Sequence, residues 1–209
     1  MTIAQQNLLL TDILRPTSFD DLTLSDNQIN AFRKMYDKDN LMNMIFYGRP
    51  GVGKTSAALL FAKDRYFSTL HINGAELNKG GYEDMLISAS SIVFDGYIKR
   101  IIIDEADTVS EKLQDRLRYD IEEKSKSCRF ILTTNELSQL SDAIRSRCFP
   151  ISFDPSHKDK DHIIKRLESR IASKLEAYKV SDEAISKAVH DHFPDMRKIA
   201  NAIQFSSVI

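Results

Sequence analysis

The sequence has 209 residues, of which 42% are hydrophobic and 28% charged. This composition is typical of a globular protein with a buried core and excludes a disordered or collagen-like chain, while the length allows one large domain or a medium domain with a small one. The 29 basic and 30 acidic residues leave a net charge of −1, so a polyanion such as nucleic acid would have to bind a local basic patch.

The N-terminal residues show no targeting pattern. They lack the basic start and apolar run of a signal peptide, and the sequence contains no stretch of about 18 apolar residues, so no membrane segment is expected. Cys128 and Cys148 are the only cysteines, too few for the disulfide framework of a secreted protein. These features favour a reducing intracellular compartment, the cytoplasm or, in a eukaryotic setting, the nucleus.

Short apolar runs that alternate with helical segments predict an α/β fold. The predicted strands are Met42–Tyr47, Thr69–Ile72, Arg100–Ile103, Arg129–Thr133 and Pro150–Phe153, and helical apolar spacing is found at Lys54–Phe67, Tyr82–Phe94 and Ser110–Glu123. The third strand is almost entirely branched aliphatic, as parallel strands buried on both faces are. We therefore expect a five-stranded parallel sheet flanked by helices.

The last quarter of the chain predicts helices alone. After Asp154-Pro155-Ser156, helical patterns cover His157–Tyr178, Ser181–Asp191 and Pro194–Phe205. Ser181 and Pro194 are residue types typical of helix starts. The chain is expected to divide into an α/β domain over residues 1–155 and a small three-helix lid domain over residues 156–209.

The strongest chemical motif lies between the first predicted strand and the helix after it. Residues 48–55, GRPGVGKT, fit the pattern G-x-x-x-x-G-K-[ST] at every fixed position, although a Gly-rich turn can match by chance. Backbone N–H groups of such a loop wrap a phosphate chain at the positive end of the following helix. We predict an ATP site with Mg²⁺, in which Lys54 reaches the β- and γ-phosphates and Thr55 binds the metal. The predicted nucleotide contacts are Gly48, Pro50, Gly51, Val52, Gly53, Lys54, Thr55 and Ser56.

Two carboxylates follow the third predicted strand, in Asp104-Glu105-Ala106-Asp107. They would lie at the carboxyl edge of the sheet, where ligands bind in open α/β folds. Asp104 is expected to hold Mg²⁺, directly or through water, and Glu105 to orient or deprotonate the water that attacks ATP. The alternative is an acidic cap on the next helix. An RNA helicase is not indicated, because the second half of the chain lacks another α/β fold.

In their order, these motifs resemble those of the AAA+ ATPases, and within them the small ATPase subunits of sliding-clamp loaders, of the replication factor C and T-even phage type. The resemblance covers most of the chain. Leu14-Arg15-Pro16 and Phe19-Asp20-Asp21 look like the family's stretch that lies against the adenine base, which implies base contacts from Arg15 and Pro16. Asn73 occupies the position of a polar residue that couples DNA binding to the catalytic glutamate.

Three further residues take their roles from the same resemblance. Asn135 ends the fourth strand and looks like sensor 1, which contacts the γ-phosphate or its water. Arg147, in Ser146-Arg147-Cys148, corresponds to an arginine finger that completes a neighbouring subunit's site, and Arg197, in Asp195-Met196-Arg197, to sensor 2 of the lid. Taken singly, Asn135 could cap a strand, Arg147 could be a solvated surface charge, and Arg197 could simply extend along its own helix with its charged end in water.

The resemblance also implies DNA and protein partners. Lys79, Arg116 and Arg118 are the candidates for phosphate-backbone contacts, with Lys112 and Gln114 on the same predicted helix as the two arginines. Interleaved acidic residues make a mixed solvated helix face the alternative. Gln114 and Arg118 could instead couple subunits, and the sequence does not separate these roles.

Taken together, the sequence favours a DNA-stimulated ATPase subunit of a clamp loader that acts with other loader subunits, a sliding clamp and primer–template DNA in replication. A helicase loader or replication initiator of the same superfamily, and a nucleotide-binding scaffold without turnover, are the alternatives. Relatives continue past the lid into a helical collar that holds the ring together, whereas this sequence ends at Ile209. A monomer is therefore expected in isolation, with assembly favoured by nucleotide.

Overall fold

The computed structural model describes residues 9–37, 41–62, 69–91 and 98–206. These residues form two units. The first, which we call the sheet unit, comprises Arg33–Gly48 and Lys54–Ser152, and the second, the lid unit, comprises the residues up to Phe32, Arg49–Gly53 and the residues from Phe153 onward. The predicted division of the chain at residue 155 stays a prediction.

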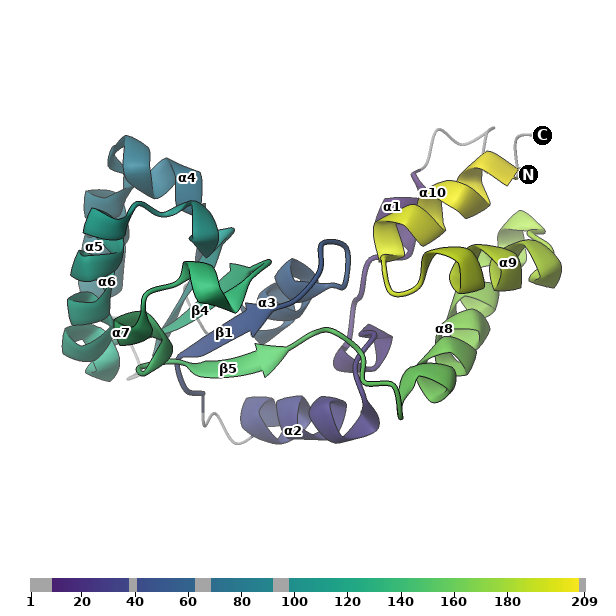
Figure 1. The fold of residues 1–209 in the computed structure, drawn as a ribbon, viewed down its shortest axis with the longest axis horizontal. Helices are drawn as coiled ribbons and strands as arrows, with labels where there is room; N and C mark the ends of the chain where they lie inside the picture. The colour runs from purple at the N-terminus through teal and green to yellow at the C-terminus, as the bar shows by residue number, and fades with distance from the viewer. Residues whose placement is uncertain (1–8, 38–40, 63–68, 92–97, 207–209) are drawn as a thin grey trace. The chain divides into compact units, whose positions relative to one another are not determined.

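One five-stranded sheet organises the sheet unit. Its strands are β1 (Met44–Tyr47), β2 (Thr69–Asn73), β3 (Lys99–Asp104), β4 (Cys128–Thr134) and β5 (Phe149–Ser152), in the order β2-β3-β4-β1-β5. Every pairing is parallel, which confirms the predicted sheet, and Figure 1 shows β4, β1 and β5 running side by side. The register aligns Asn73 with Asp104 and Tyr47 with Thr134, so the strands end together at one edge of the sheet.

The helices of the sheet unit follow the predicted pattern with additions. The three predicted helices are α3 (Lys54–Ala62), α5 (Tyr82–Ser90) and α6 (Glu111–Glu123). The predicted C-terminal parts of the first two, to Phe67 and Phe94, extend into residues outside the described ranges. The structure adds short helical turns that the sequence did not predict: α4 (Gly74–Glu76), η3 (Leu77–Gly81), η4 (Ala106–Thr108), η5 (Lys124–Lys126), η6 (Leu137–Gln139) and α7 (Asp142–Arg145).

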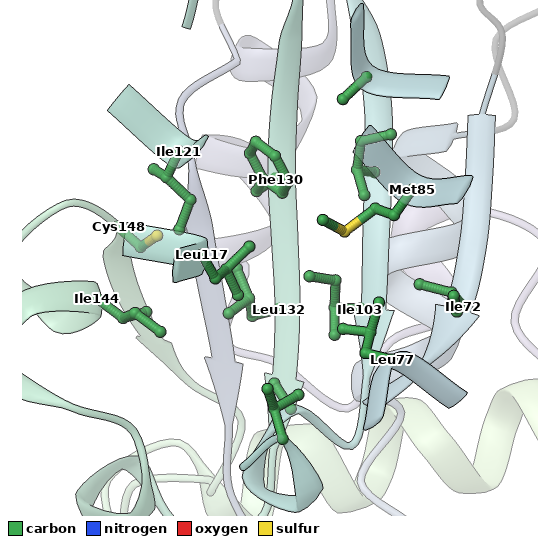
Figure 2. Packing of buried hydrophobic residues seen from close by; sticks show 14 of the residues in the cluster. Ile72, Leu77, Met85, Ile103, Leu117, Ile121, Phe130, Leu132, Ile144 and Cys148 are labelled. Carbon is green, nitrogen blue, oxygen red and sulfur yellow. The ribbon is translucent and has the colours of Figure 1, made fainter. Parts of the chain in front are cut away.

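The core of the sheet unit lies on the face of the sheet that α5 and α6 cover (Figure 2). Ile103 and Leu132, from the adjacent strands β3 and β4, are fully buried there. Leu117 of α6 packs into the same cluster. Cys128 and Cys148 belong to it as well, and burial raises the thiol pKa to about 11 for Cys128 and to about 12 for Cys148. Both thiols are therefore protonated at neutral pH, as expected of core residues.

The lid unit contains the three predicted C-terminal helices, α8 (Lys160–Leu175, continued by η7, Glu176–Tyr178), α9 (Asp182–His192) and α10 (Met196–Ser206). Their apolar faces share one core with α1 (Leu10–Ile13), which packs on α10 (Figure 1). The Ser181 hydroxyl caps α9 by accepting from the N–H of Ala184 at 3.3 Å, as predicted.

The predicted start of the last helix at Pro194 is wrong by two residues. α10 begins at Met196, because the carboxylate of Asp195 accepts hydrogen bonds from the N–H groups of Arg197 at 3.0 Å and Lys198 at 3.1 Å. A side chain that satisfies these otherwise unpaired donors acts as the N-cap, so it fixes where the helix starts. Three N-terminal elements were also not predicted: α1, η2 (Phe19–Asp21) and α2 (Asp26–Asp37).

Asp21 connects the N-terminal segment to α8 through contacts with two basic side chains of that helix. Its carboxylate accepts from the N–H and hydroxyl of Thr17, at 2.8 and 3.0 Å, and lies 3.4 Å from Nζ of Lys174 and 4.0 Å from Nε of Arg170. Burial alone would raise the pKa of this carboxyl, but the bonds from Thr17 and the two cations outweigh burial and hold the pKa below its ordinary value. The ionised form of Asp21 therefore stabilises the fold.

We expect Asp21→Asn to lower the free energy of unfolding at pH 7 by about 1.5–3 kcal/mol, the range for hydrogen bonds to a charged group. A lowered pKa means that this stability is present above the unfolded-state pKa, about 4, and is lost as pH falls through the folded-state pKa. Urea unfolding at a series of pH values from 7 to 3 should therefore show the gap between wild type and variant closing at the acid end. Asp84→Asn, at an exposed position on α5, is the control; a pH-independent gap would contradict the role of the Asp21 charge.

Candidate nucleotide site

The glycine loop that connects β1 to α3 has a backbone available mainly to glycine. Gly51 has φ of 81° and Gly53 has φ of 96°, values that side-chain-bearing residues rarely adopt. A Cβ at Gly51 would also lie 2.1 Å from Oδ1 of Asp195, so no larger residue fits there without displacing the cap of α10. Glycines with positive φ at positions 51 and 53 let the backbone of the loop curve. The N–H groups of a backbone curved in this way form a concave array that binds anions.

Lys54 and Thr55 open α3 and reach polar groups at the carboxyl edge of the sheet. The buried Nζ of Lys54 donates to the carbonyl of Gly48 at 2.6 Å and to Oδ1 of Asn135 at 3.1 Å. The hydroxyl of Thr55 donates to the carboxylate of Asp104 at 2.9 Å. The structure thus brings together five residues that the sequence analysis assigned to one site: Gly48, Lys54, Thr55, Asp104 and Asn135.

Asp104 receives a further donor that the sequence analysis did not assign. The hydroxyl of Thr133, at the end of β4, forms a short hydrogen bond with the Asp104 carboxylate and accepts from the N–H of Glu105 at 3.1 Å. Nε2 of His71 lies 3.8 Å from the same carboxylate. Thr133 directly precedes Thr134 and Asn135 at the end of β4. Its place near Asn135, a predicted site residue, was the signal in the sequence that could have assigned Thr133 to the site.

Glu105 has an unusual backbone conformation, and its carboxylate is hydrogen-bonded to Asn73. Its φ of 53° and ψ of 49° lie in the left-handed region, where a non-glycine residue is uncommon and the conformation is maintained by its surroundings. The carboxylate accepts from Nδ2 of Asn73 at 2.9 Å, and Oδ1 of Asn73 in turn accepts from the N–H of Ala75 at 2.9 Å. The predicted coupling residue and the predicted catalytic carboxylate are therefore in direct contact.

The predicted DNA-contact or coupling residues separate into two environments. Gln114 is 4% exposed, and its amide donates to the carbonyls of Val109 and Gln139 and accepts from the N–H of Ser141. Burial of this kind excludes a direct contact with DNA.

The basic candidates are exposed, and two of them are paired within the chain. Arg116 lies over the ring of Tyr82 and pairs with Glu83 at 2.9 Å, and Arg118 lies 3.7 Å from Asp115. Lys79 is exposed in η3.

Arg147, the predicted arginine finger, lies beside α6. Its Nε is 2.8 Å from the carboxylate of Glu122, and its Nη1 donates to the carbonyl of Ala143 at 2.8 Å. The side chain is 28% exposed, so it borders solvent with one face.

The remaining predicted nucleotide contacts, apart from Ser56, belong to the lid unit. Arg15 and Arg197 are exposed and Pro16 is half-buried. Pro50 of the glycine loop is exposed, while Val52 is 1% exposed. Ser56, in the first turn of α3 in the sheet unit, is half-buried.

The donor set at Thr55 and Asp104 fits Mg²⁺. A hydroxyl and a carboxylate are the hard oxygen ligands that this ion takes in proteins, and Mg²⁺ usually keeps waters and phosphate oxygens as its other ligands. Within the described ranges, no group of three or more His, Cys, Asp or Glu residues could hold a metal by itself. A cation at Asp104 is thus expected to depend on the phosphates of a nucleotide.

The fold and this edge of the sheet define a phosphate-loop α/β protein: a glycine loop between the first strand and a helix, followed by Lys-Thr, with acidic residues at the end of a neighbouring strand. Residues 44–155 match the model of the "ATPase family associated with various cellular activities (AAA)". The chain belongs to the AAA family.

Individual relatives are similar over nearly the whole chain. It is 31% identical to replication factor C small subunit 2 of Pyrobaculum islandicum over 92% of its residues, and 32% identical to the replication factor C small subunit of Natronomonas pharaonis over 93%. Replication factor C subunit 3 of Saccharomyces cerevisiae is 30% identical over 96%. The chain spans 60 to 62% of the length of these relatives.

Solved structures agree on the fold. The Thermotoga maritima RuvB Holliday junction branch migration motor superposes with a TM-score of 0.58 over 92% of this chain and 73% of that chain, at 20% identity. This likeness supports the AAA fold alone. None of the helices in the described part of the chain is long and apolar enough to cross a membrane.

Gly74 is the residue that permits the Glu105 backbone to approach the start of α4 closely. A Cβ at this position would lie 2.5 Å from the carbonyl oxygen of Glu105 and 2.7 Å from the hydroxyl of Thr108. We expect Gly74→Ala to lower the free energy of unfolding by about 1–3 kcal/mol, because backbone atoms must shift to accept the methyl group.

Urea unfolding measures this loss, and Gly80→Ala is the control. Gly80 has φ of 108° but open space around its Cβ position, so alanine there costs about 1–2 kcal/mol of backbone strain and no clash. If Gly74→Ala is no more destabilising than Gly80→Ala, the close approach of Glu105 does not restrict this position.

Proposed function

We propose that this chain is an ATPase subunit of a DNA sliding-clamp loader, which binds and hydrolyses ATP with Mg²⁺ to place a clamp on primer–template DNA. Membership of the AAA family and similarity to replication factor C small subunits support this proposal. The observation that carries the hydrolytic part is the set of hydrogen bonds that gathers Lys54, Thr55, Asp104, Glu105 and Asn135 at one edge of the sheet, with Thr133 joining Glu105 to Asp104.

The protein groups each have a chemical task in this proposal. Lys54 supplies a positive charge to the β- and γ-phosphates, and Asn135, which accepts a hydrogen bond from its Nζ, orients the γ-phosphate or the attacking water. Thr55 and Asp104 would hold Mg²⁺, which neutralises charge on the phosphate oxygens when bound. Glu105 orients the attacking water and accepts its proton.

Asn73 controls the availability of Glu105 in this proposal. A carboxylate that accepts from an amide at 2.9 Å has one lone pair occupied and is held in a set orientation. Because Asn73 also caps α4, a displacement of this turn would change the bond to Glu105. We propose that DNA, contacted near Lys79, changes hydrolysis through this turn.

Arg147 acts on a neighbouring subunit in the proposed assembly, which would contain other loader subunits arranged around DNA. Gln114 connects the acidic motif to the segment that carries Arg147. Its side-chain amide binds the carbonyl of Val109, which follows the acidic motif, and the N–H of Ser141, which begins the segment that leads to Arg147. We propose coupling for Gln114 and Arg118, and contact with the DNA backbone for Lys79 and Arg116. From the lid unit, Arg15 and Pro16 would contact the base and Arg197 the phosphates.

We expect Glu105→Gln to bind ATP with nearly unchanged affinity and to lose about 100-fold or more of kcat, because the amide cannot accept a proton from water. Lys54→Ala should instead lose binding itself. Titration of a fluorescent ATP analogue and steady-state hydrolysis, each with and without primer–template DNA, separate the two effects. Hydrolysis that persists in Glu105→Gln would place the base elsewhere, and an unchanged affinity in Lys54→Ala would contradict the phosphate-loop assignment.

Arg147→Ala should bind ATP normally but hydrolyse it at least about 100-fold more slowly in assembled protein, because the missing guanidinium stabilises charge in the transition state. The Arg147→Ala and Glu105→Gln variants are each defective in a different half of the shared site. Mixing them with DNA at high protein concentration should therefore restore hydrolysis above the sum of the two.

Wild-type protein over the same concentrations is the reference, since an activity that rises steeply with concentration indicates assembly. A steep rise for wild type without any restoration in the mixture would mean that Arg147 does not act across subunits. An Arg145→Ala variant, two residues earlier in the same segment, controls for loss of a positive charge.

A further inference from the structure

Thr23 contacts the glycine loop from outside the motif. Its hydroxyl donates to the carbonyl of Val52 at 3.1 Å, and both residues are buried, with Thr23 3% and Val52 1% exposed. A second contact reaches the same loop from α10, where the N–H of Met196 donates to the carbonyl of Gly51 at 3.0 Å. Both contacts lie within the lid unit.

A bond to a backbone carbonyl also sets the direction of the next N–H group. The peptide unit is planar, and in the trans form its C=O and N–H point in opposite directions. The bond from Thr23 therefore directs the N–H of Gly53 away from Thr23, and the bond from Met196 directs the N–H of Val52 in the same way. These are N–H groups of the segment that the motif assigns to phosphate binding.

Thr23 is itself held by neighbours on both sides. Nη2 of Arg166, on α8, donates to the carbonyl of Leu22 at 3.1 Å and forms a short bond with the carbonyl of Leu24, while its Nη1 pairs with Asp26. Thr23 thus lies between two carbonyls that one guanidinium fixes. Thr23 and Arg166 also line the same small cavity beside α8.

Arg166 belongs to a row of cations on α8. Arg170 donates to the carbonyl of Leu14, and Lys174 to that of Arg15 and to Asp21, so residues four apart on one face of the helix bind different parts of the N-terminal segment. The segment that carries Thr23 is therefore fixed along α8 rather than at one point.

We propose that Thr23 is a positioning residue for the nucleotide phosphates: its hydroxyl holds the Val52 carbonyl and thereby orients the Gly53 N–H, and Arg166 keeps Thr23 in place. The inference rests on the proposed function, since it assigns to Thr23 a part in the ATP site. It goes beyond the glycine motif, because the polar atom that orients the loop comes from the N-terminal segment.

The test compares Thr23→Val, which keeps the shape but loses the hydroxyl, with Thr23→Ser, which keeps the hydroxyl. Titration of a non-hydrolysable ATP analogue should show an affinity about three- to tenfold weaker for the valine variant, the effect of one lost hydrogen bond, and an affinity within about twofold of wild type for the serine variant. In steady-state hydrolysis, KM should rise while kcat changes little.

Thr69→Val is the matched control, because the Thr69 hydroxyl also donates to a backbone carbonyl, that of Ala62 at 3.2 Å, but does not touch the loop. It should lose stability without losing affinity for the analogue. The Gly53 amide resonance supplies a direct readout, and we expect it to shift in Thr23→Val and not in Thr69→Val.

Each outcome decides the matter. If the wild-type protein does not bind the analogue, the proposed function is wrong. If the wild-type protein binds the analogue and Thr23→Val binds it equally well, only the role of Thr23 is wrong. Equal weakening by valine and serine at position 23, or equal weakening by Thr69→Val, would mean that packing or general stability sets affinity, and would also overturn the inference.

Arg166→Gln tests the second half of the proposal. If Arg166 acts through Thr23, the double variant with Thr23→Val should bind the analogue only as weakly as the weaker single variant, because the same interaction cannot be lost twice. Losses that multiply would show that Arg166 and Thr23 act independently.

Discussion

The carboxylate of Asp104 is the group around which the candidate site is built. Its side chain is 20% exposed, and a carboxylate in such a position is costly unless donors compensate for the lost water. Thr55, from the first turn of α3, and Thr133, from the end of β4, provide them. The hydrogen bonds thereby join a helix and two strands through one side chain, so a shift of any of the three elements changes the geometry of the other two.

The fold could be predicted because its sheet is parallel and buried. Strands such as Arg100–Ile103 read as unbroken aliphatic runs, and all five predicted strands lie within two residues of the observed ends. The site residues Lys54, Asp104 and Asn135 could be predicted to meet because each follows or ends a strand of one parallel sheet. Pairing of these strands brings their carboxyl ends to one edge.

The elements and contacts that were not predicted form because of local helix caps or because of residues that are distant in the sequence. α2 had a usable signal: Ser25 and Gln28 form a capping box, with the N–H of Ser25 bound to Oε1 of Gln28 at 3.2 Å, and this S-x-x-Q spacing is visible in the sequence. Thr23 had none, because a threonine that binds a carbonyl 29 residues away looks like any other threonine until the chain is folded. The same holds for the three backbone partners of buried Gln114.

The contact of Arg147 with Glu122 bears on how an arginine can serve a neighbouring subunit. Glu122 is 60% exposed, and an ion pair this open to solvent is worth about 0–1 kcal/mol, which a phosphate could replace at little cost. The Nη1 of the same guanidinium donates to the carbonyl of Ala143, in α7, at 2.8 Å. For the trans role that we propose, Glu122 would thus hold a partly exposed guanidinium by a weak ion pair, so that its charge is available to a partner that approaches with ATP already bound.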